Sequence, residues 1–198
     1  MVHEIKEHVP PWRAHSNAKV QKRVYGAFCR VFHDFDSAWQ SLCSRRLNGA
    51  NPVELFSFLC RFTKASSAYA SLCVVKTLVG SWFTDVRLHT QGVRPCVFGC
   101  DARDDLAHYQ CCWALKVVLL RVGLAVEADC NWDFSSSAQS FLSCFVSYVS
   151  YHAVRFHDVA SPAAIDFAVS WAVKALDMQF ASTAGQKIVQ AARECRNP

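Results

Sequence analysis

Hydrophobic residues recur at steps of three and four along most of the chain, which is the spacing of one face of an α-helix. Such runs predict helices over residues 16–47, from 52, from 66 or 67 to 79, over 113–126 and 134–159, from 162, and over 183–195. Strict alternation of apolar and polar residues, the pattern of a β-strand, is nearly absent. The sequence therefore predicts a mainly α-helical fold.

Breaks in this pattern divide the chain into four regions. Residues 1–15 are polar, contain Pro10-Pro11 and are expected to form an extended lead-in. Residues 16–80 form an N-terminal helical region, residues 81–112 have few helix signals and hold a cysteine cluster, and residues 113–198 form a C-terminal helical region. Because no low-complexity linker separates these regions, we expect one compact domain overall.

Length and composition place the chain among globular proteins. Its 198 residues, 52% of them hydrophobic, are enough for a sizeable core. The longest uncharged stretch, residues 134–154, approaches the length of a membrane span, but serines, Gln139 and His152 interrupt it. We therefore expect a buried helix there and no contact with a membrane.

The N-terminus and the cysteines indicate the compartment. The first residues carry mixed charges and no apolar run, so we expect no secretory signal. Most of the 11 cysteines stand singly in apolar helical patterns, where a free thiol behaves as a small hydrophobic group. We expect a reducing intracellular location, in the nucleus or the cytoplasm.

One segment contains residues whose spacing indicates chemistry. Cys96 and Cys100 are separated by a turn that contains Gly99, and His108 and Cys112 follow four residues apart. Residues four apart lie on one face of a helix, so the second pair can approach a metal ion held by the first pair. Three thiols and one imidazole are a common donor set for structural zinc. The segment predicts a zinc knuckle embedded in the helical domain.

The fourth ligand is ambiguous, because Cys111 and Cys112 both lie near the helix face of His108. A separation of four residues aligns the side chains better than three, so we favour Cys112 and keep Cys111 as the alternative. Four protein ligands leave no open position for water or substrate. The expected zinc is therefore structural.

Elsewhere the sequence offers no catalytic site. It contains no phosphate-binding glycine loop and no nucleophile with an evident triad partner, so we expect no enzymatic activity and no small-molecule substrate. Polar residues do interrupt the long apolar run near its end, namely His152, Arg155, His157 and Asp158. We interpret them as groups satisfied within a buried helix or as a basic surface stripe.

Residues 76–113 resemble the zinc-binding segment C-terminal to the reverse transcriptase of non-LTR retrotransposons. That family shows a tryptophan, then Thr-x-x-Arg-Leu/Met-His, a Cys-x₂₋₃-Cys turn, an acidic patch, a histidine and a cysteine. This chain matches it with Trp82, Thr84, Arg87-Leu88-His89, Cys96, Cys100, Asp104-Asp105, His108 and Cys112. The resemblance covers about a fifth of the chain and implies bound zinc, together with contact with RNA or DNA.

The resemblance gives candidate nucleic-acid contacts among the residues in and beside the knuckle. Candidates for phosphate contact are Arg87, Arg94 and Arg103 with the flanking Lys76 and Arg121, which would supply affinity without sequence readout. His89 and Tyr109 can stack on an unpaired base, and Tyr109 is equally suited to the core or to support of a metal ligand. The net charge of +5 is compatible with such a partner.

The chain also departs from that family. It has no Tyr/Phe-x-Asp-Asp motif of a polymerase palm and no endonuclease signature, so polymerase activity is not implied. The favoured interpretation is a non-enzymatic zinc-binding module that contacts RNA or DNA. Two alternatives stay open: a helical protein-interaction or scaffold domain that binds a protein through its helical faces with a purely structural zinc, and a retroelement fragment without a function.

Overall fold

A computed structural model describes residues 35–47, 51–89, 92, 94–126 and 137–194. The expected lead-in at 1–15, the start of the 16–47 helix and its predicted end at Asn48-Gly49 lie outside these residues. Contacts divide the chain into two compact units, Met1–Ser41 and Leu42–Pro198. Helix α2 (Phe35–Arg46) crosses this division. The expected knuckle and the C-terminal helical region both belong to the second unit.

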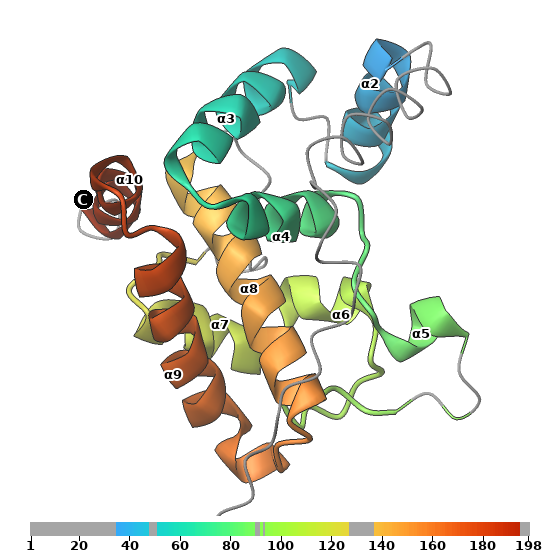
Figure 1. The fold of residues 1–198 in the computed structure, drawn as a ribbon. Helices are drawn as coiled ribbons and strands as arrows, with labels where there is room; N and C mark the ends of the chain where they lie inside the picture. The colour runs from blue at the N-terminus through green and yellow to red at the C-terminus, as the bar shows by residue number, and fades with distance from the viewer. Residues whose placement is uncertain (1–34, 48–50, 90–91, 93, 127–136, 195–198) are drawn as a thin grey trace, which may run out of the picture. The chain divides into compact units, whose positions relative to one another are not determined.

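The described part of the second unit is built from short and long helices (Figure 1). They are α3 (Pro52–Ala65), α4 (Ala68–Leu78), α5 (Asp85–Leu88), α6 (Leu106–Cys111), α7 (Trp113–Arg121), α8 (Ala138–Phe156), α9 (Ser161–Gln179) and α10 (Thr183–Glu194). No strand occurs among the described residues, where the only β-type pairing recorded is an isolated antiparallel bridge between Pro95 and Arg103. The prediction of a mainly α-helical fold is confirmed.

Side-chain caps fix where several helices begin. The Asn51 carboxamide oxygen accepts hydrogen bonds from the first turn of α3, and Pro52 occupies the first helical position, where its missing N–H is not needed. Ser67 caps α4, and Ser137 caps α8 through the N–H of Ser140. The predicted starts at 52 and at 66 or 67 therefore agree with these caps, whereas α8 begins at Ala138, four residues after the predicted start at 134.

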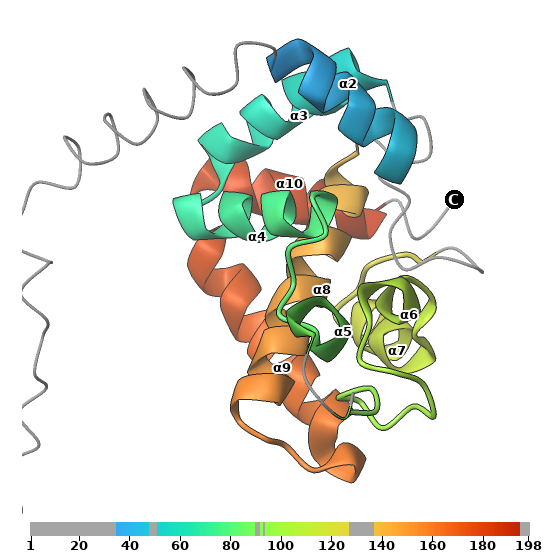
Figure 2. The same cartoon turned by 90° about the vertical axis from the view of Figure 1, so that its right-hand side faces the viewer.

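Helix α8 is the centre of the second unit (Figures 1 and 2). Every residue from Ser140 to Val154 is buried, and α4, α7, α9 and α10 pack against the helix. Small side chains recur on both partners of the α8–α9 pair, as serines on α8 (Ser140, Ser143, Ser147, Ser150) and alanines on α9 (Ala164, Ala168, Ala172, Ala175). Such residues let two helix backbones approach closely. None of the described helices has the length and apolarity needed to cross a membrane.

His152 is a buried titratable group on α8, and it makes stability depend on pH. Burial, and then the positive charges of Lys76 and Arg155, lower the pKa of His152 from 6.5 to about 4. The unfolded chain therefore takes up this proton near pH 6.5, whereas the folded chain resists it down to about pH 4. The contribution of neutral His152 is complete above pH 6.5 and is lost as the pH falls, by about 3 kcal/mol in total.

We expect His152→Phe to flatten the pH dependence of the unfolding free energy between pH 6.5 and pH 4. Phenylalanine retains a packed aromatic ring, but it lacks the imidazole that the unfolded chain protonates. Urea unfolding at a series of pH values measures the slope, with His157→Gln as the control because His157 is exposed at the end of the same helix. An unchanged slope in His152→Phe would show that other groups cause the acid sensitivity.

Candidate metal centre

The first two thiols of the cluster lie on a closed turn between Pro95 and Arg103. The N–H of Cys96 donates to the carbonyl of Ala102 at 2.7 Å, and the N–H of Gly99 donates back to the carbonyl of Cys96 at 2.9 Å. Gly99 has φ +83°, a left-handed conformation that glycine adopts without strain. The turn buries the side chains of both Cys96 and Cys100.

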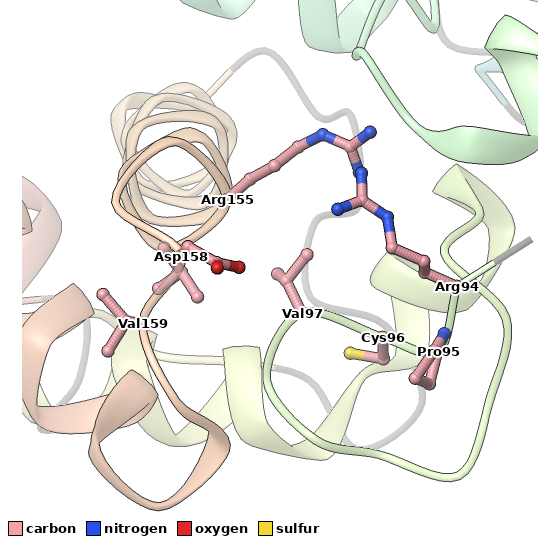
Figure 3. A pocket seen from close by; sticks show the side chains of 8 residues that line it. Arg94, Pro95, Cys96, Val97, Arg155, Asp158 and Val159 are labelled. Atoms are coloured by element: carbon pink, nitrogen blue, oxygen red, sulfur yellow. The ribbon is translucent and has the colours of Figure 1, made fainter. Parts of the chain in front are cut away.

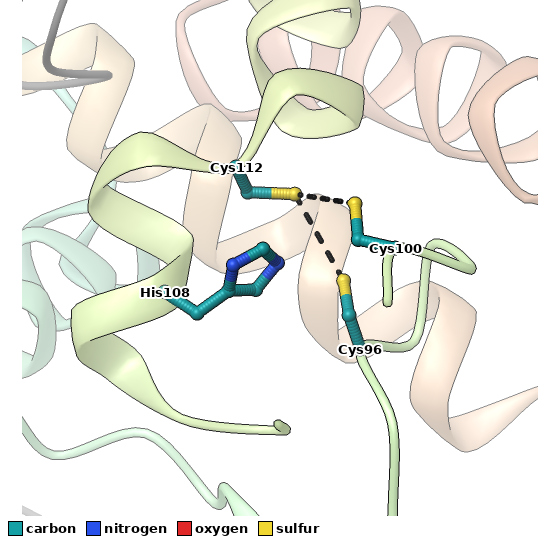
Figure 4. A group of neighbouring side chains, drawn as sticks. All are labelled: Cys96, Cys100, His108 and Cys112. Carbon is teal, nitrogen blue, oxygen red and sulfur yellow. Dashed lines mark hydrogen bonds between the residues drawn. The ribbon is translucent and has the colours of Figure 1, made fainter. Parts of the chain in front are cut away.

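The other two donors lie on the helical segment that follows. Helix α6 starts at its N-cap Asp105, whose side chain accepts a hydrogen bond from the N–H of Ala107. His108 lies on this helix, and Cys112 is the residue at which α6 ends and α7 begins, with φ −61° and ψ 115°. The break in the helix at Cys112 places its buried thiol beside the turn (Figure 4).

The four donor atoms of Cys96, Cys100, His108 and Cys112 all lie within 4.8 Å of one another. The Sγ atom of Cys112 is 3.9 Å from that of Cys96 and 3.5 Å from that of Cys100. A tetrahedral ion with metal–sulfur bonds of about 2.3 Å requires sulfur–sulfur separations of about 3.8 Å. The two distances lie on either side of that value, so these residues can hold a metal ion.

His108 has an atom that fits this interpretation. Its Nε2 is buried and has no hydrogen-bond partner in the part of the chain that the structure describes. Figure 4 shows the imidazole facing the three sulfur atoms. A buried polar atom without a partner is costly, and a metal–nitrogen bond would remove that cost.

The structure separates the two candidates for the fourth ligand. Cys111 is exposed, and its thiol contacts the carbonyls of His108 and Ala107 at 3.3 and 3.8 Å on its own helix. Cys112 is fully buried and belongs to the cluster. The preference for a spacing of four over three identified the residue that lies beside the other donors.

The thiols interact with one another strongly. The interaction with the Cys112 thiol lowers the pKa of Cys96 despite its burial, with help from the backbone N–H groups of Phe98 and Cys100. The same interaction raises the pKa of Cys112, and burial raises the pKa of Cys100. A bound cation would favour ionisation of all three.

Gly99 also lies against the start of α9. A Cβ atom at this position would be 1.7 Å from Ser161 Oγ and 2.8 Å from Ser161 Cβ. Two costs therefore oppose any side chain here, the positive φ angle and the contact with Ser161.

We expect Gly99→Ala to destabilise the fold by about 2–3 kcal/mol, since strained backbone costs about 1–3 kcal/mol and overpacking about the same. The additional change Ser161→Gly should recover only the steric part. Thermal unfolding of the single and double variants measures both, and a Gly99→Ala protein as stable as wild type would contradict this geometry.

Tyr109 connects the turn to the helix that follows it. Its hydroxyl donates to Asp104 Oδ1 at 2.7 Å and accepts from the N–H of Val97, next to Cys96, at 3.2 Å. Its ring packs against Trp82 and Tyr151, with centroids 5.6 and 4.9 Å away. Tyr109 thus fixes the Cys96 end of the turn against the core.

Asp104, which accepts the hydrogen bond from Tyr109, belongs to a buried ionic network. The Arg155 guanidinium, on α8, donates to Asp104 Oδ2 and to Asp85 Oδ1, the latter at 2.6 Å. Both carboxylates are buried, with 1% or less of Asp85 and Asp104 exposed. Asp104 also accepts from the N–H of Asp85 at 2.8 Å and from the Tyr151 hydroxyl at 3.3 Å. Arg155 thereby joins α8 to both segments that flank the Cys96–Cys100 turn.

Arg94 completes the network from the outside. Its Nε is 2.9 Å from Asp85 Oδ2, while 61% of its side chain stays exposed. Hydrogen bonds from Arg94 and then Arg155 hold the pKa of Asp85 well below its usual range, in spite of its burial. Both guanidinium groups line a pocket of about 180 Å³ together with Val97 and Asp158 (Figure 3).

Sequence reasoning singled out the four donor residues that the structure brings together but only part of this supporting network. Asp104 entered as part of an acidic patch, and Arg155 as a polar group in a buried helix or a surface stripe. Asp85 was not singled out, although it directly follows the N-cap Thr84. A lone arginine near the end of a long uncharged helix was the available signal that a buried carboxylate lies opposite it.

The candidate nucleic-acid contacts have different surroundings in the structure. Arg87, His89, Arg94 and Arg103 are exposed on the segments around the knuckle. Lys76 is half-buried, with its Nζ 3.2 Å from the Tyr148 hydroxyl, and the exposed Arg121 forms an ion pair with Asp166.

The prediction that Tyr109 can stack on a base is wrong for this structure. The residue is fully buried among aromatic side chains, and its hydroxyl is used by Asp104 and Val97. The alternative role in the core, in support of the ligands, is the one that its contacts match.

Comparisons with known proteins found no relative of this chain. No family model, no curated protein sequence and no solved structure matches the chain.

Proposed function

We propose that this chain is a zinc-binding module that contacts nucleic acid. The observation that carries the proposal is the convergence of three thiols and one imidazole within 4.8 Å, on a turn and the helical segment that follows it. A module of this kind needs no catalytic group, because the metal ion serves only to hold the nucleic-acid-binding surface in shape.

Zinc is the ion that suits this donor set best. Thiolates select zinc, copper(I) or iron–sulfur clusters over magnesium and calcium, and a Cys₃His tetrahedron is a common structural zinc site. All four positions of the shell would be filled by Cys96, Cys100, His108 and Cys112, so the ion would stabilise the fold and would not bind substrate. It would join the turn at 95–103 to the α6–α7 break.

The exposed charge around the knuckle supports the nucleic-acid part of the proposal. Arg87, Arg94 and Arg103 are exposed cations on the segments that flank the Cys96–Cys100 turn, and His89 lies beside them in sequence. The ion pair of Arg94 with Asp85 holds its guanidinium in place, which lowers the entropy cost of binding a phosphate. The similarity of residues 76–113 to the zinc-binding segment of retrotransposon reverse transcriptases supports the same partner class.

A salt titration tests this proposal. We expect wild-type protein to bind RNA or DNA with an affinity that falls steeply as salt rises, and Arg87→Glu/Arg103→Glu to lower the slope of log K against log salt by about 0.7–0.9 per lost contact. Lys187→Glu on α10 is the matched control, an exposed cation far along the chain from the knuckle. Equal binding and equal slopes in all three proteins would contradict the proposed contact surface.

An exposed groove lined by aromatic and methionine side chains favours a second candidate function, that of a protein-interaction domain. A pocket of about 400 Å³ is lined by Tyr69, Trp171 and Met178, which are 50%, 40% and 63% exposed, together with Lys174. Exposed aromatic and methionine side chains are enriched at protein interfaces. Binding through this groove would change little with salt, which distinguishes it from phosphate contact.

A further inference from the structure

A cluster of aromatic rings and one lysine lies on the second unit, away from the metal ligands. It consists of Lys76 near the end of α4, Phe83 in the segment before α5, and Tyr148, His152 and Phe156 on α8. Phe83 is 45% exposed and Phe156 is 75% exposed. Both rings contact the ring of His152, and exposed apolar patches commonly mark a binding surface. We call these five residues the aromatic–lysine cluster.

The three residues on α8 form one row because they are four apart. The His152 ring is 4.1 Å from that of Tyr148 and 5.8 Å from that of Phe156, with which it is stacked at 26°. Phe83 meets His152 edge-on, with centroids 5.8 Å apart. The segment between α4 and α5 runs along α8 (Figure 2), and the Tyr151 hydroxyl holds it there through the carbonyl of Phe83 at 2.9 Å.

His152 has polar atoms that nothing satisfies. It is 6% exposed, and neither of its ring nitrogens has a hydrogen-bond partner in the described part of the chain. A neutral imidazole offers one donor and one acceptor. Both nitrogens are buried, so His152 serves this cluster through its ring, on which the exposed ring of Phe156 stacks.

Lys76 adds a positive charge at the rim of the same cluster. Its Nζ lies 5.7 Å from the ring centroid of Phe83 and 5.6 Å from that of Tyr148, and it is 3.2 Å from the Tyr148 hydroxyl. The ammonium is therefore held in position above two rings, with no carboxylate among its recorded partners. A ligand that brings an anionic group would meet this charge.

We propose that the aromatic–lysine cluster binds an unpaired nucleotide of a single-stranded nucleic acid. The base would stack on the exposed ring of Phe156, which itself stacks on His152, and its phosphate would meet Lys76. Every base has a flat face, so stacking of this kind needs no particular sequence. Bases within a duplex cover these faces with their neighbours, which restricts the site to unpaired nucleotides. This inference rests on the proposed function, because it requires that the module contacts nucleic acid.

Phe156→Ala is the most direct variant, because a side chain that is 75% exposed contributes little to folding. We expect it to weaken binding of a short fluorescein-labelled single-stranded RNA or DNA about ten-fold or more in fluorescence anisotropy. Phe156→Trp keeps a stacking ring and should retain wild-type affinity. Phe56→Ala on α3 is the matched control, since Phe56 is also an exposed phenylalanine and lies outside the cluster.

The affinity of the same variants for a duplex of equal length shows whether the effect is specific to single strands. A loss on single strands that is absent on the duplex supports the site. If Phe156→Ala binds single strands as wild type does, or loses affinity for single strands and duplex equally, the proposed nucleotide site is wrong while the proposed function stands. If wild-type protein binds neither nucleic acid at any salt concentration, the proposed function fails, and this inference fails with it.

Discussion

Replacement of Cys112 by serine is expected to abolish metal retention and to lower the unfolding free energy by about 5 kcal/mol, or about 10–20 °C in melting temperature for a domain of this size. Cys112 is fully buried, and its thiol lies within 3.9 Å of both other cluster thiols. A serine hydroxyl is a poor zinc ligand, and the remaining three donors would leave the ion partly coordinated. Differential scanning calorimetry with parallel metal analysis measures both effects.

Cys111→Ser provides an unusually close control for this experiment. The same chemical change is made one residue earlier, at an exposed thiol that contacts only carbonyls of its own helix in the recorded hydrogen bonds. We expect this variant to keep its metal and nearly all of its stability. If Cys111→Ser lost the metal and Cys112→Ser kept it, the assignment of the fourth ligand would be reversed.

Replacement of Arg155 by methionine is expected to cost about 3–5 kcal/mol, because it leaves two buried carboxylates without their shared partner. Asp85 and Asp104 are almost fully buried, and 12% of the Arg155 side chain is exposed. The variant should also bind the metal more weakly, since Asp104 holds Tyr109, and Tyr109 holds the backbone beside Cys96. Urea unfolding and competition with a chelator measure the two losses.

Removal of the two buried negative charges should recover much of that loss. In the triple variant Arg155→Met/Asp85→Asn/Asp104→Asn, no buried carboxylate is left without a cation, and neutral amides still accept hydrogen bonds from Tyr109 and the backbone. Arg155→Lys should be intermediate, because an ammonium cannot bridge two carboxylates as a guanidinium does. An Arg155→Met protein with wild-type stability would contradict the role of the network.

The helical fold was predictable because its signals are local. Ser67 and Ser137 cap the helices that the apolar spacing predicts, and Pro52 occupies the first turn of α3. The one-turn helix α5, by contrast, depends on contacts from distant residues. The buried carboxylate of Asp85 in it pairs with Arg155, 70 residues later, as well as with Arg94. Periodicity in a short window contains no information about such a partner.

The clustering of the four donor residues was predictable for the same local reason. All four lie within 17 residues, and the spacing of His108 and Cys112 follows from the geometry of one helical turn. The sequence left the role of Tyr109 open between base stacking and the core, because its burial depends on Trp82 and Tyr151, which come from other parts of the chain. The aromatic–lysine cluster was missed for a similar reason, since it combines α4, the segment before α5 and α8.

The measurement that tests the central claim most directly is the metal content of protein purified without added metal or chelator. Native mass spectrometry of the intact chain gives the identity and the number of bound ions in one spectrum. We predict one zinc ion per chain in wild type and in Cys111→Ser, and none in Cys112→Ser. A folded wild-type protein without zinc or any other metal ion would contradict the assignment of Cys96, Cys100, His108 and Cys112 as a zinc site.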